Sequence, residues 1–398
     1  MLRRGLLVVV IIATGAIAAG VWISRSGGAR VPADATRSVR QPAHRAVSAS
    51  KAHQTAAGPS WRTPPQSLAR LIGGLIITGA TRESTAAQPG LAQLIRDGDV
   101  GGVIVTDTSV ASSAALVHEL QSDAGAGGNP PLLIATDQEG GLVRRYAGIG
   151  PAASAAALGR GSPSTTRSQA TAAACRLRQQ GVTLDLAPVA DTATRPDGFI
   201  AQEKRSFGAT AAITGPNVAA FVHGLENGGV AATLKHFPGL GAAVVSTDTI
   251  LSERLSDPGV PGAFLAGIQA GAQVVMVSNA TYVSGPFTSS MPAFATPAVY
   301  RWMRTTGFGG ATVTDSLSGA ALQSDPRLPD PAVQALAAGA DLVLFVDDTG
   351  RQARLALSRI HAAVLDGRLS RARLGQAWRR VQEVKLAQMD LASKATCG

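Results

Sequence analysis

The 398-residue chain has little cysteine, few aromatic side chains and, in its first seventy residues, almost no acidic ones. Two cysteines, Cys175 and Cys397, are too few for a disulfide framework. Cys175 lies in an alanine-rich helical pattern, which favours a small buried hydrophobic side chain over a nucleophile. Aromatic residues make up 4% of the chain, and no basic groove interleaved with aromatic rings supports binding to nucleic acid.

Most of the net charge of +10 comes from the N-terminal end of the chain. Residues 1–70 hold ten Lys and Arg residues but a single acid, Asp34, which leaves 26 basic and 25 acidic residues after Arg70. The part of the chain that can form a core is therefore close to neutral. Hydrophobic residues make up 45% of the sequence, enough for a sizeable buried core.

The first 23 residues have the pattern of an export or anchor segment. A short basic start, Met1–Arg4, precedes the uncharged apolar run Leu6–Ile23. This pattern predicts either a secretory signal peptide, with Ala16-Ile17-Ala18 as a cleavage site, or an uncleaved membrane anchor. No cysteine follows the run, which excludes a bacterial lipoprotein anchor. Residues 24–65, rich in Ala, Ser, Arg and Pro, predict a disordered linker, so we expect an extracytoplasmic domain that is either secreted or membrane-anchored.

From residue 66 onward, short apolar runs alternate with helical patterns. The predicted strands are Gly73–Thr78, Gly102–Thr106, Leu132–Thr136, Val182–Leu186, Ala231–Leu234, Gln273–Val277, Ala311–Thr314 and Asp341–Val346. The predicted helices between them are Leu91–Arg96, Ala114–Leu120, Ala170–Gln179, Val218–Glu226, Ala263–Ala270, Ala298–Arg304 and Val333–Ala338. Eight alternating units predict an α/β fold, a (β/α)₈ TIM barrel spanning residues 66–390 as a single catalytic domain. Two C-terminal helices, Arg351–Leu365 and Arg371–Met389, are expected to close its outside.

Polar side chains follow several of these predicted strands. Asp137 follows the third strand, Lys235 and His236 the fifth, Asn279 the sixth and Asp315 the seventh. The active sites of (β/α)₈ barrels lie at the C-terminal ends of the strands. We therefore expect these side chains to meet in one pocket.

The motifs that contain these residues resemble the family 3 glycoside hydrolases, in particular their single-domain β-N-acetylglucosaminidase branch. The resemblance rests on KHFPGLG (Lys235–Gly241), DQEGGLVRRY (Asp137–Tyr146), LDLAPVADT (Leu184–Thr192), KRSFG (Lys204–Gly208), VVMVSNATY (Val274–Tyr282), TGFGGATVTDSLSG (Thr306–Gly319) and AAGADLVLF (Ala337–Phe345). It implies a retaining hydrolase that removes terminal β-linked N-acetylglucosamine from cell-wall material.

The resemblance also implies a role for each site residue. Asp315 corresponds to the nucleophile that forms a covalent glycosyl-enzyme. The residues that correspond to the sugar-binding set are Asp137, Arg145, Arg205, Lys235 and His236. We expect Asp185 and Asp191 to support loops, and Glu139 to pair with an arginine rather than donate a proton. No metal or organic cofactor is implied; the expected partner is a carbohydrate, and the chain is expected to be a monomer.

The sequence departs from the family at the residue that should transfer the proton. The family carries an Asp-Ser-His triplet on the loop after the fifth strand, and this chain has Asp248-Thr249-Ile250. Isoleucine cannot transfer a proton. Leu240 and Asn279 also replace residues that are His in the family.

Three explanations follow from this loss. Asp248 or Glu253 acts as the acid and base with a pKa raised by burial, the chain is a slow hydrolase, or it is a non-catalytic binder of sugar or peptidoglycan fragments. A phosphate-binding barrel is disfavoured, because the paired acids Asp347 and Asp348 after the eighth strand would repel an anion.

Overall fold

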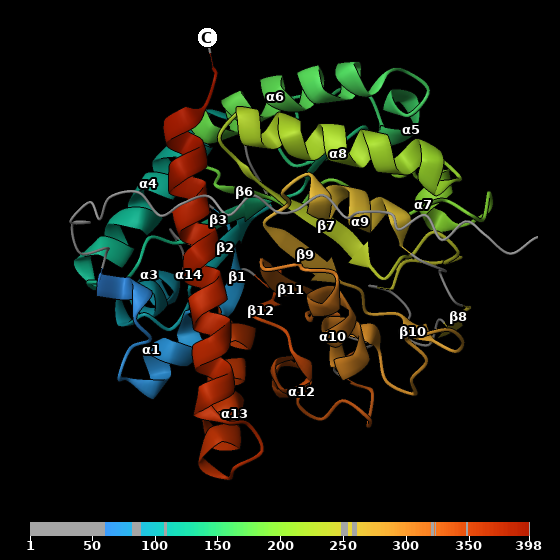
Figure 1. Cartoon of the computed structure of the whole chain (residues 1–398). Helices are drawn as coiled ribbons and strands as arrows, with labels where there is room; N and C mark the ends of the chain where they lie inside the picture. The colour runs from blue at the N-terminus through green and yellow to red at the C-terminus, as the bar shows by residue number, and fades with distance from the viewer. Residues whose placement is uncertain are drawn as a thin grey trace, which may run out of the picture. The chain divides into compact units, whose positions relative to one another are not determined.

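The computed structural model confirms the predicted barrel. It describes residues 60–81, 89–106, 110–247, 254–256, 261–319, 322, 324–347 and 349–397, with the side chains of 110–112 left out. The predicted signal or anchor segment and nearly all of the predicted linker lie outside these residues. Parallel strands close a barrel in the order β1-β12-β11-β9-β7-β6-β3-β2 (Figure 1). Their bounds are β1 Ile76–Ala80, β2 Gly102–Val105, β3 Leu133–Thr136, β6 Leu184–Asp185, β7 Ala231–Phe237, β9 Val274–Val277, β11 Ala311–Ser316 and β12 Leu342–Leu344.

Each predicted strand is present, several of them with different boundaries, and packing explains the differences at the first and the fifth strand. The first strand was expected from Gly73, which instead ends helix α1 (Leu68–Gly73). A Cβ at Gly74 would overlap the ring of Trp378, so this turn is tight enough to require glycine. The fifth strand was expected to end at Leu234. It continues through Lys235 and His236 because Phe237 still pairs with Val277 of β9.

Helices cover the outside of the barrel. Besides α1 they are α3 Pro89–Asp97, α4 Val110–Ala126, α5 Ala155–Leu158, α6 Pro163–Gln179, α7 Phe199–Gln202, α8 Ala211–Asn227, α9 Gly262–Gln269, α10 Pro297–Thr305, α12 Pro331–Ala338, α13 Arg351–Leu365 and α14 Arg371–Lys394. Two short 3₁₀ helices, η1 Ser60–Arg62 and η2 Ala293–Ala295, and two small sheets complete the described fold. The sheets pair β4 Gln138–Gly140 with β5 Val143–Arg144 and β8 Arg254–Leu255 with β10 Thr281–Tyr282.

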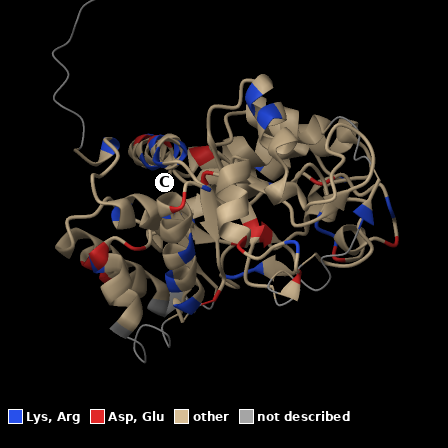
Figure 2. Ribbon diagram, turned by 90° about the horizontal axis from the view of Figure 1, so that it is seen from below, with Lys and Arg blue, Asp and Glu red and all other residues tan. Residues whose placement is uncertain are grey.

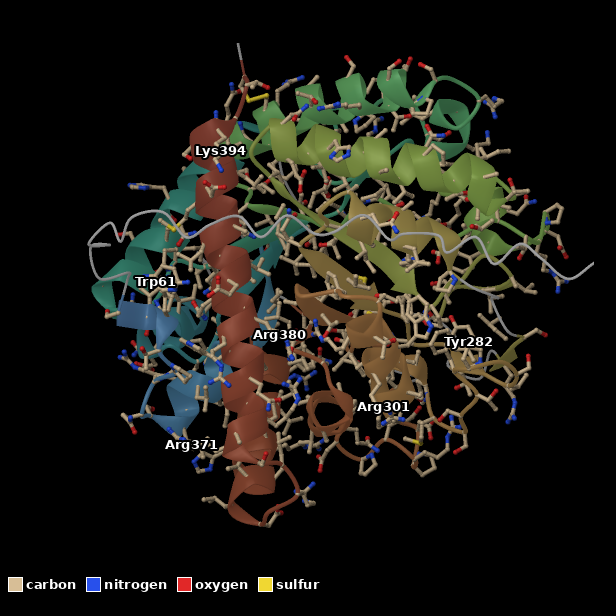
Figure 3. All side chains as sticks on the ribbon, viewed as in Figure 1. Trp61, Tyr282, Arg301, Arg371, Arg380 and Lys394 are labelled. Atoms are coloured by element: carbon tan, nitrogen blue, oxygen red, sulfur yellow. A yellow bond between two sulfur atoms is a disulfide. The ribbon has the colours of Figure 1, made fainter. Side chains whose placement is uncertain are left out.

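Helix α14 packs against the barrel with an apolar face. Trp378, Val381 and Val384 are buried there, and the Trp378 indole donates to the carbonyl of Trp61 at 3.2 Å. Figure 1 shows α14 crossing in front of the barrel and ending beside α6, and Figure 3 labels Trp61, Arg380 and Lys394 on and around it. The C-terminal helices thus close the barrel as predicted.

The prediction that Cys175 is a simple buried hydrophobe was wrong. Cys175 of α6 forms a disulfide with Cys397, just beyond α14, across a sequence separation of 222 residues (Figure 3). A single bridge of this kind leaves no pattern in the sequence, because only the packing of α14 brings the two cysteines together.

The described surface carries charges of both signs. Figure 2 shows Lys and Arg interspersed with Asp and Glu along the helices and loops of the face that it presents. Among the described residues, no helix has both the length and the apolar character needed to span a bilayer.

Candidate active site

A cavity of about 550 Å³ opens at the C-terminal ends of the barrel strands. Asp137 directly follows β3, Lys235 and His236 lie near the end of β7, and Asp315 lies near the end of β11. Arg145 and Arg205 line the same cavity from loops. The structure therefore brings together six of the seven residues that the sequence placed in the site.

The seventh, Asp248, lies outside the described residues, as do Ile250 and Glu253. The described chain reaches the cavity as far as Ser246 and Thr247, which both line it. The assignment of Asp248 as a catalytic residue therefore stays a prediction.

Four charged side chains form a connected network on one wall of the cavity. The Lys235 ammonium lies 2.6 Å from Asp137 and 2.7 Å from Glu139. Arg205 donates two hydrogen bonds of 2.8 Å to the two oxygens of the Glu139 carboxylate. Lys235 and Glu139 are almost completely buried, so each needs these partners to remain charged.

The network favours the charged forms of Glu139 and Lys235. Burial alone would raise the pKa of Glu139, but the charges of Lys235 and Arg205 outweigh it and lower the pKa to about 2. Burial would likewise lower the pKa of Lys235, yet Asp137 and Glu139 raise it. A carboxylate with so low a pKa cannot donate a proton near neutral pH, which agrees with the expectation that Glu139 pairs with an arginine.

The backbone of the DQEGG segment positions Glu139. β4 and β5 form a small hairpin whose turn contains Gly140 and Gly141, with φ of 101° and 62°. Gln138 fixes the hairpin from beneath: its amide nitrogen donates to the carbonyls of Tyr146 at 3.1 Å and Ile149 at 2.7 Å. The Arg145 N–H donates to the Asp137 carbonyl at 3.2 Å, which ties the two predicted binding residues together.

Asp191 holds the loop that begins at the end of β7. Its Oδ2 lies 2.7 Å from Nδ1 of His236, and its Oδ1 accepts the N–H groups of His236 at 3.1 Å and Leu240 at 2.7 Å. Asp191 is fully buried. The loop-supporting position expected for it is confirmed, and its contact with His236 fixes the imidazole ring at the cavity.

Asp185 lies below the charged network and has a different character. Its Oδ1 accepts the Gln138 N–H at 2.9 Å, while Oδ2 is buried without a partner among the described residues. Burial raises the pKa of Asp185 well above its usual value, and the neighbouring Asp137 and Glu139 add to the shift. The protonated form of Asp185 is therefore favoured, in contrast to Glu139.

The predicted nucleophile stands on a different wall. Asp315 lies on β11, is partly exposed to the cavity, and its Oδ1 accepts the N–H of Ser316 at 2.8 Å. Asn279, which replaces a histidine of the family, is buried, and its amide donates to the Ser316 carbonyl at 2.9 Å. Asn279 therefore braces the strand end that carries Asp315 but does not line the cavity, so the expectation that it meets the other side chains in the pocket was wrong.

Sequence reasoning missed the rest of the lining. Ser246, Thr247, Ser316 and Ser318 add hydroxyl groups, and the apolar lining includes Phe199, Met276 and Val346. Ser318 also accepts the N–H of Val346 at 2.9 Å, linking the loops that follow β11 and β12. Ser316 and Ser318 stand one and three positions after Asp315, and this closeness in the sequence could have placed them in the site. Within the described residues no group of three or more His, Cys, Asp and Glu side chains could hold a metal ion.

Comparisons with known proteins agree with this geometry. Residues 72–384 match the family described as "Glycosyl hydrolase family 3 N terminal domain". The chain is 30% identical over 391 residues to the beta-hexosaminidase LpqI of Mycobacterium tuberculosis, covering 93% of this chain and 95% of that protein. It is 32% identical over 315 residues to an uncharacterized secreted glycosyl hydrolase of Arthroderma benhamiae, covering 74% and 87%.

A solved structure has the same fold. The family 3 beta-N-acetylglucosaminidase of Paenibacillus sp. str. FPU-7 superposes with a TM-score of 0.75 at 29% identity. The match covers 84% of this chain and 65% of the Paenibacillus chain. On the extent of these matches and on the cavity described above, this chain belongs to glycosyl hydrolase family 3 and is a glycosyl hydrolase.

Proposed function

We propose that the chain is a retaining β-N-acetylhexosaminidase that removes terminal β-linked N-acetylglucosamine from cell-wall fragments. The observation that carries this proposal is that Asp315 lines the same cavity as the network of Asp137, Lys235, Glu139 and Arg205. A retaining hydrolase needs a carboxylate nucleophile next to a polar surface that holds the sugar. The relatives named beta-hexosaminidase and beta-N-acetylglucosaminidase support the choice of sugar.

The network is suited to hold the hydroxyl groups of one sugar ring. Ionised carboxylates accept hydrogen bonds from hydroxyls, and Lys and Arg side chains donate to them, in both cases with the added strength of charge. In this proposal Asp137, Arg145, Arg205, Lys235 and His236 bind the sugar. The Asp137 and Lys235 side chains are already fixed by their ion pair of 2.6 Å, so little conformational entropy remains to be lost on binding.

Asp315 then attacks the anomeric carbon. The bond from that carbon to the leaving oxygen breaks as the bond to the carboxylate forms, and water later cleaves the glycosyl-enzyme with retained configuration. A strand end is a rigid support for such a nucleophile, and the Ser316 N–H that Asp315 accepts limits its rotation.

We assign proton transfer to Asp248, on the loop that carries the histidine of the family. Ile250 replaces that histidine and cannot act, and the doubly paired Glu139 has too low a pKa. An aspartate in this role must be protonated before attack, which requires burial of the loop around it. Protonation of the leaving oxygen is then the step that limits the rate on substrates with poor leaving groups.

A substrate comparison tests this proposal. An aryl β-N-acetylglucosaminide has a good leaving group that needs little protonation, whereas a β-linked disaccharide of N-acetylglucosamine needs much. We expect turnover of the aryl glycoside and turnover of the disaccharide slower by about 10²–10⁴-fold. Equal rates on both would contradict weakened proton transfer, and no turnover of either would contradict the proposed hydrolase.

The replaced loop histidine favours a second candidate function, that of a sugar or peptidoglycan-fragment binder without catalysis. It predicts no cleavage of either substrate but retained binding of N-acetylglucosamine. Equilibrium binding measured beside the two assays separates the two functions.

We also propose that the chain works outside the cytoplasm. The Cys175–Cys397 disulfide is a bond that persists in oxidising compartments and is rare in reducing ones. The relative from Arthroderma benhamiae is named as secreted. The apolar run of residues 6–23 supplies an export or anchor segment.

A further inference from the structure

A second cavity, mostly apolar but lined by several hydrogen-bond donors, lies at the opposite end of the barrel from the candidate active site. It measures about 160 Å³ and lies beneath α14, between that helix, Arg178 of α6 and the segments that lead into the strands. Leu132 precedes β3, Thr183 precedes β6 and Gly229 precedes β7, so the cavity is at the N-terminal ends of these strands. At ~30 Å³ for each water molecule in the liquid, it has room for about five waters or one small ligand.

Three hydrogen-bond donors that line this cavity have no partner among the described residues. The amide nitrogen of Gln388 and Nε of Arg178 are both buried and unpaired. Lys385, one turn before Gln388 on α14, is 4% exposed and makes no hydrogen bond or ion pair within the described chain. Burying such groups without partners costs free energy, so these donors need acceptors in the cavity, supplied by ordered water or by a ligand.

A neighbouring side chain shows that the cavity wall can satisfy its polar groups where the fold requires it. Gln121 of α4 lines the same cavity, donates to the Leu132 carbonyl at 3.1 Å and accepts the Leu132 N–H at 2.9 Å. The unpaired donors are therefore specific to the side formed by α14 and α6.

No described carboxylate compensates the charge of Lys385. Burial lowers the pKa of its ammonium to about 7, and no acid opposes this shift. An ammonium, a guanidinium nitrogen and an amide nitrogen are all donors, so the complementary ligand carries negative charge on several acceptor oxygens.

We propose that this cavity binds a small oxyanion, a carboxylate or a phosphate, held by Lys385, Gln388 and Arg178. The ligand bridges α14 and α6, the same two segments that the Cys175–Cys397 disulfide joins. Because it contacts the folded arrangement alone, occupancy stabilises the docking of the C-terminal helix on the barrel.

Thermal unfolding of the full chain tests the proposal, with inorganic phosphate and acetate as probes against sodium chloride at matched ionic strength and fixed pH. The variants are Lys385→Met, which removes the charge, and Arg178→Lys, which keeps charge but removes Nε. Lys394→Met is the matched control, because Lys394 lies on the same helix but is exposed and paired with Asp390 at 2.6 Å (Figure 3).

In the wild type and Lys394→Met we expect phosphate or acetate to raise the melting temperature by about 2 °C at tenfold excess over the dissociation constant, and to raise it further with the logarithm of the concentration above that. Lys385→Met should lose this response, and Arg178→Lys should need a higher concentration for the same rise in melting temperature. An equal response in all four proteins, or none in any of them, overturns the proposal and leaves a water-filled cavity. If Lys385→Met does not fold, a higher concentration needed for the same rise in melting temperature in Arg178→Lys but not in Lys394→Met still supports the proposal, and equal concentrations in both overturn it.

Discussion

The guanidinium of Arg205 and the carboxylate of Glu139 form two hydrogen bonds of 2.8 Å each, almost fully removed from solvent. Lys235 adds a third contact to the same carboxylate at 2.7 Å. One acidic side chain thus fixes two cations that line the proposed sugar site, and its loss should disturb both.

Glu139→Gln should destabilise the fold by about 3 kcal/mol, because it leaves two buried cations without their shared partner. Urea unfolding at neutral pH measures this. Glu203→Gln is the matched control: Glu203 contacts the same arginine at 3.4 Å, but its side chain is 47% exposed, so we expect a loss of at most about 0.5 kcal/mol. Equal losses in both variants would contradict the importance given to the buried network.

The stability difference between the wild type and Glu139→Gln should depend on pH. The pKa of Glu139 is lowered from its usual value of 4.5 to about 2, so its ionisation stabilises the folded state fully above pH 4.5. This contribution is lost as the pH falls from 4.5 toward 2. Unfolding measured across that range should show the two proteins converging, and a constant difference would contradict the assigned ionisation.

Asp185 should have the opposite dependence. Its pKa is raised by burial, so the folded state holds a proton that the unfolded state releases above its usual pKa of 3.8, and stability falls as the pH rises from there. Asp185→Asn keeps the acceptor for Gln138 and removes the titration. Relative to the wild type, the variant should therefore gain stability from acid to neutral pH in unfolding experiments. A stability difference that does not change with pH would contradict a raised pKa of Asp185.

The disulfide between Cys175 and Cys397 closes a very long loop, since its ends are 222 residues apart. The chain-entropy argument gives it a stabilisation of up to about 5 kcal/mol. Cys175→Ser with Cys397→Ser should lower the melting temperature by up to about 10 °C, and a reducing agent should do the same to the wild type only. The two single serine variants should match the double variant, and an unchanged melting temperature would contradict a structural role for the bridge.

The barrel could be predicted from the sequence because each strand is a short apolar run followed by polar residues. The prediction failed at the end of the fifth strand, where Lys235 and His236 have the pattern of a loop but extend the strand through pairing with β9. Sheet pairing can hold charged residues in a strand when their side chains have partners, as Lys235 has in Asp137, 98 positions earlier in the chain. A partner so far away in the chain cannot be predicted from the pattern of neighbouring residues.

Many residues of the site could be predicted by resemblance, but the full set of contacts between them could not. Motifs identified Asp137, Arg205 and Lys235 and predicted an arginine partner for Glu139, but not that Glu139 also contacts Lys235. The disulfide escaped prediction for the same reason, since only the packing of α14 beside α6 brings its cysteines within reach. The assignment of Asp248 is still a prediction, because it rests on the sequence alone.

Covalent labelling of the nucleophile tests the central claim most directly. A fluorinated N-acetylglucosamine derivative with a good leaving group should trap the glycosyl-enzyme, because fluorine slows its hydrolysis more than its formation. Mass spectrometry should then find one added sugar on the peptide that contains Asp315, and Asp315→Ala should lose both the label and the cleavage of an aryl glycoside, by on the order of 10⁴-fold or more. No label on the wild type, a label on another residue, or undiminished cleavage by Asp315→Ala would contradict the account.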